Sequence, residues 1–183
     1  VVDEIKEAGG EATPNFDSVS SYEGGFNMVK TAMDTYGRLD IVICNAGILR
    51  DMAFHNMGEA DWDAVFAVHI KGSFTVLRAD WPVFRQQSYG RVILTTSSSG
   101  IYGQFGQANY GAAKTAMIGL MNVLKQEGAK YNVMVNTIAP VAGTAPMMAF
   151  TSEDLPAPLA PSTPSTSPGS TSRSTPRTAL TLP

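Results

Sequence analysis

Residues 90–114 read GRVILTTSSSGIYGQFGQANYGAAK, and their pattern predicts a strand, a loop and the start of a helix. The run 90–96 is apolar and rich in β-branched residues, which is typical of a buried strand in a parallel sheet. Small and glycine residues follow it, and a helical stretch begins near Ala108. Ser97 therefore falls where a strand ends and a loop begins, the edge at which open α/β sheets bind ligands.

The flanking sequence repeats this alternation of short apolar runs and amphipathic stretches. Apolar runs at 39–44 (LDIVIC) and 132–138 (NVMVNTI) predict two more strands, the first of them covered on both faces. The stretches between them predict helices over residues 22–36, 61–77 and 108–129. Strands that alternate with helices of this length predict βαβ crossovers, and therefore an α/β fold with a parallel sheet.

Punctuating residues set the expected ends of these helices. Ser20 or Ser21 offers an N-cap for the helix that starts at residue 22, and Gly37 closes that helix. Asp61 is the expected cap of the second helix, and Pro82 limits how far the second helix continues without a kink.

The composition predicts one globular domain followed by a disordered end. The chain has 183 residues, a net charge of −3 and a single cysteine, Cys44, which excludes an internal disulfide. It shows no basic cluster that would attract nucleic acid, no apolar run of about 18 residues and no visible targeting signal. Residues 1–150 are expected to form the domain, whereas the Ser-, Thr- and Pro-rich residues 151–183 predict a disordered tail.

Ser97, Tyr110 and Lys114 together predict a proton-transfer site. Tyr110 and Lys114 are four residues apart, so they share one face of a helix. A phenol is a weak acid at neutral pH, and an adjacent ammonium stabilises its phenolate form. Ser97 can donate a hydrogen bond to an alcohol or carbonyl oxygen held beside the phenol. Taken alone, however, a tyrosine and a lysine at this spacing are more often part of a solvated helix surface.

Four motifs in the same order resemble the short-chain dehydrogenase/reductase family. They are Ser97 thirteen residues before Tyr110, the sequence QANY that ends at Tyr110, NAG at 45–47 and VNTIAP at 135–140. The resemblance implies a Rossmann-like, doubly wound parallel sheet and the transfer of a hydride between NAD or NADP and an alcohol or ketone. It implies that Tyr110 is the acid/base, that Ser97 binds the substrate oxygen, and that Lys114 assists Tyr110 and binds the nicotinamide ribose.

The same resemblance implies further cofactor contacts. Asn45, Ala46 and Gly47 would line the adenine-side ribose, Asp17 matches the family's acidic residue at the adenine, and Pro140 would border the nicotinamide. A solvated turn residue is an alternative interpretation of Asp17. The resemblance implies no metal site.

Longer segments are similar to the (3R)-hydroxyacyl-CoA dehydrogenase units of type 2 peroxisomal multifunctional enzymes. Residues 44–54 (CNAGILRDMAF), 61–74 (DWDAVFAVHIKGSF) and 97–114 carry this similarity. It implies that an acyl-CoA substrate is oxidised to a 3-ketoacyl-CoA with NAD in fatty acid β-oxidation, in the peroxisome rather than the cytoplasm. It also implies a homodimer of the complete protein. His69 stands where the wider family has an asparagine that positions a relay water, which implies a supporting role.

The sequence lacks the glycine-rich turn that holds the pyrophosphate in this fold. No G-x-x-x-G-x-G or G-x-G-x-x-G motif is present. In the family's strand order, 3-2-1-4-5-6, the extended run 10–16 would be strand 3 and 39–44 would be strand 4. We therefore expect a truncated sheet without strands 1 and 2, an exposed edge at 39–44, and weak or absent NAD binding by this chain alone.

Two other functions stay open on the sequence alone. The chain could be a catalytically inactive fragment that acts only as a dimerisation or interaction module through its helices. It could also derive from a family member that acts on a sugar, a steroid or an acyl-carrier-protein thioester.

Overall fold

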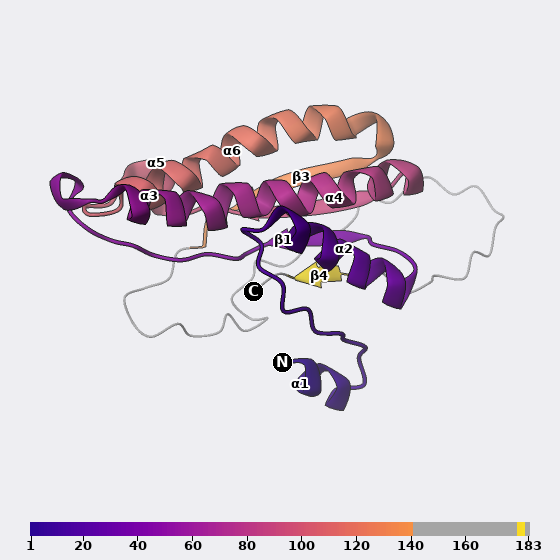
Figure 1. Cartoon of the computed structure of the whole chain (residues 1–183). Helices are drawn as coiled ribbons and strands as arrows, with labels where there is room; N and C mark the ends of the chain where they lie inside the picture. The colour runs from indigo at the N-terminus through magenta and orange to yellow at the C-terminus, as the bar shows by residue number, and fades with distance from the viewer. Residues whose placement is uncertain (141–178, 182–183) are drawn as a thin grey trace. The chain divides into compact units, whose positions relative to one another are not determined.

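The computed structural model describes residues 1–140 and 179–181. The strands of this part form one parallel sheet in the order β3-β2-β1-β4 (Figure 1). Their bounds are Ile41–Cys44 for β1, Gly90–Thr95 for β2, Val133–Ile138 for β3 and Ala179–Thr181 for β4. Helices connect β1, β2 and β3, so the predicted α/β class with parallel crossovers is confirmed.

The helices match two of the predicted stretches closely, 22–36 and 108–129, and extend the other, 61–77, to residue 87. They are α1 (Val2–Glu7), α2 (Tyr22–Tyr36), α3 (Glu59–Phe66), α4 (Gly72–Gln87), α5 (Ser98–Tyr102) and α6 (Ala108–Gly128). The shorter turns are η1 (Phe54–Asn56), η2 (Ala67–Lys71) and η3 (Ala129–Tyr131). Between α3 and α4, η2 is a π-helical turn, so the chain stays helical from residue 59 to residue 87.

One face of the sheet carries the hydrophobic core. Val42 and Cys44 of β1 and Val92 and Leu94 of β2 point to this face and are buried. They pack with apolar side chains of α2, α4 and α6, which are Met28, Val29, Ala32, Val76, Leu77, Phe84 and Met117. Burial of this apolar surface holds α6, and with it the Tyr110 and Lys114 side chains, against the sheet.

The opposite face of the sheet is only partly covered within residues 1–140. Ile41 and Ile43 alternate with the buried residues of β1 and are half-buried, while Met134 and Ile138 of β3 are 53% and 45% exposed. The prediction that the 39–44 strand is covered on both faces is therefore wrong for the described residues. The physical reason is that α2, α4 and α6 all contribute to the same core, on the same face.

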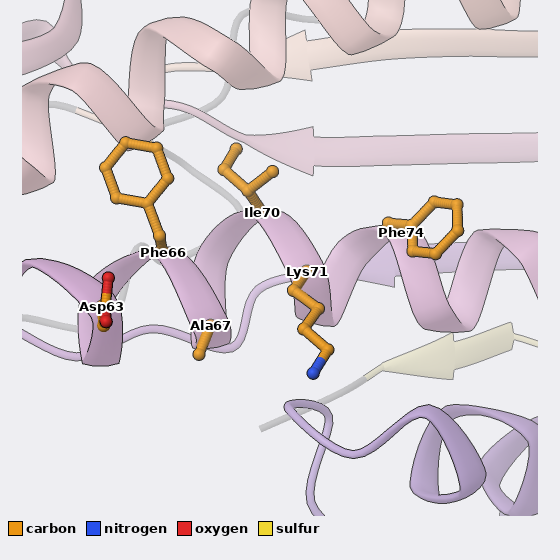
Figure 2. A pocket seen from close by; sticks show the side chains of 6 residues that line it. All are labelled: Asp63, Phe66, Ala67, Ile70, Lys71 and Phe74. Atoms are coloured by element: carbon orange, nitrogen blue, oxygen red, sulfur yellow. The ribbon is translucent and has the colours of Figure 1, made fainter.

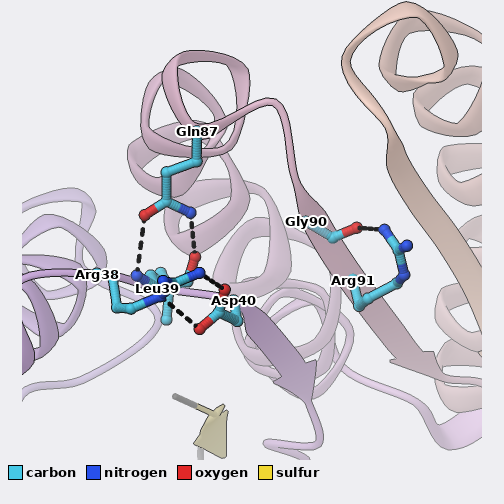
Figure 3. Close-up of polar contacts among 6 residues, drawn as sticks. All are labelled: Arg38, Leu39, Asp40, Gln87, Gly90 and Arg91. Atoms are coloured by element: carbon cyan, nitrogen blue, oxygen red, sulfur yellow. Dashed lines mark hydrogen bonds and ion pairs between the residues drawn. The ribbon is translucent and has the colours of Figure 1, made fainter. Parts of the chain in front are cut away.

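Strand β1 begins two residues later than the apolar run predicts, because side chains bind the backbone ahead of it (Figure 3). The Leu39 N–H donates to Gln87 Oε1 at 3.2 Å, and Gln87 Nε2 donates to the Leu39 carbonyl at 2.6 Å. Arg38 pairs with the buried carboxylate of Asp40 through two N–H donors, at 2.6 and 2.9 Å. These contacts fix the entry to β1 from the end of α4.

The outer edge of β1 is paired, contrary to the expectation of an exposed edge. Ile41 and Ile43 are in register with Ala179 and Thr181 of the parallel strand β4. An unpaired row of backbone groups is a template for a further strand, and β4 satisfies it. The predicted strand at 10–16 is absent, because strand 2, the strand it would pair with in the family's order, is not in this sequence. Of the predicted disordered tail, 179–181 form a strand, and 151–178 and 182–183 lie outside the described residues.

The helix signals were informative in α2 and misleading in the second helix. Ser21 caps α2 through a hydrogen bond from the Gly24 N–H at 3.2 Å, and Gly37 ends it with φ 70°, as predicted. Asp61 is not a cap, since α3 starts at Glu59 after Gly58. Pro82 lies inside α4, because the fully buried Phe84 beyond it anchors the last turns in the core.

Candidate active site

The predicted site lies at the carboxyl edge of the sheet. Because β1, β2 and β3 are parallel, Asn45, Ser97 and Pro140 all follow strands that end on this edge. The Thr95 hydroxyl at the end of β2 donates to Asn45 Oδ1 at 3.1 Å, which ties the ends of β1 and β2 together. The topology therefore gathers three of the predicted site segments.

Ser97 is the N-cap of α5, with extended backbone at φ −156° and ψ 153°. Its Oγ accepts a hydrogen bond from the Ser99 N–H at 3.2 Å. This contact uses a lone pair of the oxygen and leaves the hydroxyl proton available for donation. The half-buried serine thus has the donor that the predicted role in binding a substrate oxygen requires.

Tyr110 and Lys114 lie one turn apart on α6, and the predicted pairing of their side chains is present. Lys114 Nζ is 5.4 Å from the centroid of the Tyr110 ring. The ammonium is almost fully buried and donates to the carbonyl of Thr95 at 2.7 Å. Burial lowers the pKa of Lys114 to about 8, because a cation loses hydration there. The Thr96 hydroxyl, which donates to the Lys114 carbonyl at 2.6 Å, anchors this turn of α6.

His69, in the π-helical turn η2, packs directly against Tyr110. The two rings meet edge to face with centroids 5.3 Å apart. The Nε2 atom of the buried imidazole lies 3.2 Å from the Ile48 backbone nitrogen and 3.0 Å from the Ile48 carbonyl oxygen. Burial is the largest effect on the pKa of His69 and lowers it, so the imidazole is held in its neutral form.

The loop after β1 fits closely around His69. A Cβ atom added to Gly47 would stand 2.7 Å from His69 Cε1, so the backbone can pass the imidazole only without a side chain here. Ala46, the residue before it, packs against the hydrophobic core. This gives Gly47 and Ala46 a structural task at the site besides the cofactor contact that the resemblance implies.

The other two predicted cofactor residues, Asp17 and Pro140, are exposed and make few contacts. Asp17 is exposed, and its carboxylate accepts one hydrogen bond, from Asn27 Nδ2 at 3.3 Å. Pro140 is exposed after the end of β3. Within residues 1–140, neither of them is hydrogen-bonded to Tyr110 or Lys114, so the structure gathers the residues predicted for proton transfer more tightly than those predicted for the cofactor.

Asn109 also belongs to the site, although the sequence motif that contains it predicted a role only for Tyr110. Its side chain is fully buried and accepts from the Tyr110 N–H at 2.7 Å. Its amide donates to the carbonyls of Arg50 and Asp61 at 3.1 and 3.2 Å. The signal was an asparagine in the first turn of a helix, where such side chains satisfy free backbone groups.

An open hollow of the described surface is lined by other residues. It has a volume of about 490 Å³ and is open, and Asp63, Phe66, Ala67, Ile70, Lys71 and Phe74 line it (Figure 2). These residues repeat at helical spacing along α3, η2 and the start of α4, so the hollow is one side of a continuous helix. None of its lining residues belongs to the predicted catalytic set.

Comparison with known proteins defines the family. A sequence profile described as short chain dehydrogenase matches residues 1–156. A short-chain type dehydrogenase/reductase of Mycobacterium tuberculosis is 55% identical over 144 residues, which are 79% of this chain and 50% of the relative. The chain belongs to the short-chain dehydrogenase family, and the Rossmann-like fold that the sequence predicted is confirmed.

Two further similarities bear on function. The peroxisomal multifunctional enzyme type 2 of Mus musculus is 52% identical over 155 residues, covering 85% of this chain and 21% of that enzyme. The structure of NAD+-bound xylitol dehydrogenase has a TM-score of 0.74 and 30% identity, covering 76% of this chain and 54% of the other. The chain thus spans about half, or less, of the relatives that it matches, and the family and this neighbour support a nicotinamide cofactor.

Within residues 1–140 and 179–181, no helix has the length and apolarity to cross a membrane. The same residues contain no group of three or more His, Cys, Asp or Glu side chains placed to hold a metal ion.

Proposed function

We propose that Ser97, Tyr110 and Lys114 form the proton-transfer site of an NAD-dependent oxidoreductase that acts on a secondary alcohol or its ketone. The observation that carries the proposal is the buried Lys114 ammonium, 5.4 Å from the centroid of the Tyr110 ring on the same helix face. A positive charge in a partly desolvated setting stabilises a developing phenolate more strongly than it would in water. Burial of this cation opposes folding, and a role beside Tyr110 accounts for its presence.

The three residues divide the work by their chemistry. Ser97 donates a hydrogen bond to the substrate oxygen and holds it beside the phenol. Tyr110 removes the hydroxyl proton when the alcohol is oxidised and returns a proton when the ketone is reduced. Lys114 keeps the phenolate charge compensated. His69 supports the Tyr110 ring by its edge contact and locks the loop at Ile48.

The residues present fit one side of a nicotinamide cofactor. Lys114 Nζ makes one hydrogen bond, to Thr95, and an ammonium has three donors, so two remain for ribose hydroxyls. We propose Asn45, Ala46 and Gly47 for the adenine-side ribose, Asp17 for the adenine and Pro140 for the nicotinamide border. When bound, the cofactor would accept or supply the hydride, and NAD is proposed because the resemblance to the hydroxyacyl-CoA dehydrogenase units implies it. The sequence contains no glycine-rich turn that would bind the cofactor's pyrophosphate.

The substrate that we propose is a (3R)-hydroxyacyl-CoA, oxidised to a 3-ketoacyl-CoA in fatty acid β-oxidation. The similarity to the mouse peroxisomal enzyme over 85% of the chain supports this substrate and a peroxisomal location. The motif segments 44–54, 61–74 and 97–114 lie in the matched part, and they build the site described above.

The open hollow on α3, η2 and α4 supports the predicted homodimer of the complete protein. Phe66, Ile70 and Phe74 form an apolar stripe along one helix, and Trp62 stacks on Phe66 with centroids 4.8 Å apart. An exposed apolar stripe at helical spacing is typical of a helix that packs against a partner. We propose that this stripe is the contact between subunits. The alternative function is that the chain makes this contact and does not catalyse a reaction.

A chimera tests the proposed activity directly. In the chimera, residues 1–140 of this chain replace the matching segment of the mouse enzyme's dehydrogenase unit. The remaining mouse sequence is meant to supply the glycine-rich turn. We expect reduction of NAD with a (3R)-hydroxyacyl-CoA, and the isolated chain is expected to bind NADH weakly in a fluorescence titration. A folded chimera that binds NADH but does not oxidise the substrate would refute the catalytic function. Subunit contact alone would then be the function that the structure supports. Turnover of a sugar or steroid alcohol instead would refute the substrate.

A further inference from the structure

Large apolar side chains stand exposed on two segments beside the proposed catalytic residues. Tyr102 and Phe105, after Ser97, are 86% and 88% exposed, and Ile101 is half exposed. Leu49 and Met52, in the loop after β1, are also exposed. We call these five residues the apolar wall. Single exposed apolar side chains are ordinary, but five of them on two segments that adjoin the proposed site in the chain indicate a binding surface.

Hydrogen bonds fasten the two segments of the apolar wall to each other. The Met52 N–H donates to the Gly106 carbonyl at 2.7 Å. Beside this bond, Gln107 Nε2 donates to Asp51 Oδ2 at 2.8 Å, and the buried Asn109 amide donates to the Arg50 carbonyl at 3.1 Å. Three bonds within a few residues hold residues 50–52 against 106–109, so the apolar side chains are carried on a preorganised support.

Both segments begin or end at residues of the proposed site. The segment 98–109 starts after Ser97 and leads into Tyr110, and Ile101 and Tyr102 belong to the helix that Ser97 caps. The other segment follows Gly47, and Ile48 at its start is bonded to His69. A substrate whose oxygen is held between Ser97 and Tyr110 therefore has the apolar wall as its neighbouring surface.

We propose that the apolar wall binds the acyl chain of the substrate and makes the site prefer long chains. This inference rests on the proposed function, because it requires the reacting end of the acyl-CoA substrate to lie at Ser97 and Tyr110. Each methylene removed from water against such a surface strengthens binding about two- to fourfold. The wall is continuous with the site on both sides, which favours the substrate's own chain over a separate apolar partner.

Calorimetric titration of this chain with butanoyl-CoA and decanoyl-CoA, both below micellar concentration, tests the proposal. We expect decanoyl-CoA to bind at least tenfold more tightly than butanoyl-CoA. In the double variant Tyr102→Ser, Phe105→Ser this advantage should fall about tenfold, with butanoyl-CoA affinity changed less than twofold. Both side chains are exposed outside the core, so the variant should fold, which far-UV circular dichroism checks.

Two matched controls distinguish binding at the apolar wall from nonspecific binding to exposed apolar side chains. Phe16 is 94% exposed ahead of α2, and Met134 is 53% exposed on the open sheet face. Phe16→Ser and Met134→Ser should leave the affinity for decanoyl-CoA unchanged. Equal affinities for the two thioesters, or an equal loss in either control, would overturn the proposal.

The two proposals fail in different ways. If the chimera oxidises (3R)-hydroxyacyl-CoA and the double variant leaves the chain-length preference intact, the apolar wall is refuted and the proposed function stands. If the double variant removes the preference and the chimera is inactive, the wall stands and the catalytic function is refuted.

Discussion

The Tyr110 region and the Asp17 region were assigned to the same reaction, and they differ sharply in how they are held. Tyr110 lies beside the buried side chains of His69, Asn109 and Lys114, each of which is hydrogen-bonded to backbone. Asp17 is exposed and accepts one side-chain hydrogen bond at 3.3 Å. Proton transfer depends on groups fixed within a fraction of an ångström, and only the first region shows this fixation.

The difference is that the residues proposed for proton transfer are packed together in the described part of the chain, whereas those proposed for the cofactor are not. The acid/base residues come from α6 and β2, whose packing lies within the described core. The cofactor residues are spread over the loop after β1, the segment before α2 and the end of β3.

The largest effect is expected for Tyr110→Phe in the chimera with the mouse dehydrogenase unit. Loss of the phenol removes the acid/base, which should lower turnover about 10²- to 10⁴-fold while NADH affinity changes little. Stopped-flow absorbance of NADH measures both quantities. Tyr36→Phe, at the far end of α2, is the matched control and should retain turnover. Turnover retained in Tyr110→Phe would break the distinction between the two regions.

Gly47→Ala should disturb the fixed region without touching the catalytic groups. The added methyl group would stand 2.7 Å from the buried His69 ring, so the ring or the loop must move. Overpacking of this kind costs about 1–3 kcal/mol in the free energy of unfolding. Urea denaturation measures the cost, and Gly119→Ala is the control because no atom lies within 4 Å of its added Cβ. Equal effects of the two substitutions would contradict the close fit at His69.

Asp80 sharpens the contrast between partnered and unpartnered buried groups. Both of its carboxyl oxygens are buried without a hydrogen bond, and desolvation raises the pKa of Asp80 well above its usual value. The neutral form is favoured on folding, so its stability contribution is complete below about pH 3.8 and is lost as pH rises through the folded-state pKa. Asp80→Leu should therefore raise the free energy of unfolding at pH 7 by about 1–2 kcal/mol.

Thermal or urea unfolding from pH 4 to pH 9 measures this dependence. Asp80→Asn keeps the shape and removes the ionisation, so the difference between it and the unmodified chain should grow with pH. A difference that stays constant over this range would show that Asp80 does not ionise on unfolding.

The smallest effect on stability is expected for Asp17→Ala. The carboxylate is exposed and its single contact is long, so the free energy of unfolding should change by less than about 0.5 kcal/mol. In the chimera the same substitution should weaken NAD binding about tenfold if Asp17 meets the adenine side. Unchanged NAD affinity would assign Asp17 to the solvated turn.

Short-range patterns predicted much of this molecule, and long-range contacts account for what they missed. The spacing of Tyr110 and Lys114, the cap at Ser21 and the end of α2 at Gly37 follow from neighbours within one or two turns. The partners of the missed features lie far along the chain. Gln87 sets the start of β1 from 48 residues away, and Asn109 reaches Arg50 across 59 residues.

The edge strand β4 is the plainest example of such a contact. Its three residues lie in a stretch whose composition predicts disorder, and they pair with β1. Hydrogen bonding to an open edge outweighs weak local propensity in a segment this short.

Titration of the lysine side chains by NMR, with 13Cε-labelled lysine, tests the central claim most directly. The claim is that Lys114 is a buried ammonium beside Tyr110, and its pKa is about 8. One lysine resonance should titrate near pH 8 and disappear in Lys114→Met. If no lysine resonance titrates near pH 8, Lys114 is solvated and the proton-transfer site is not assembled.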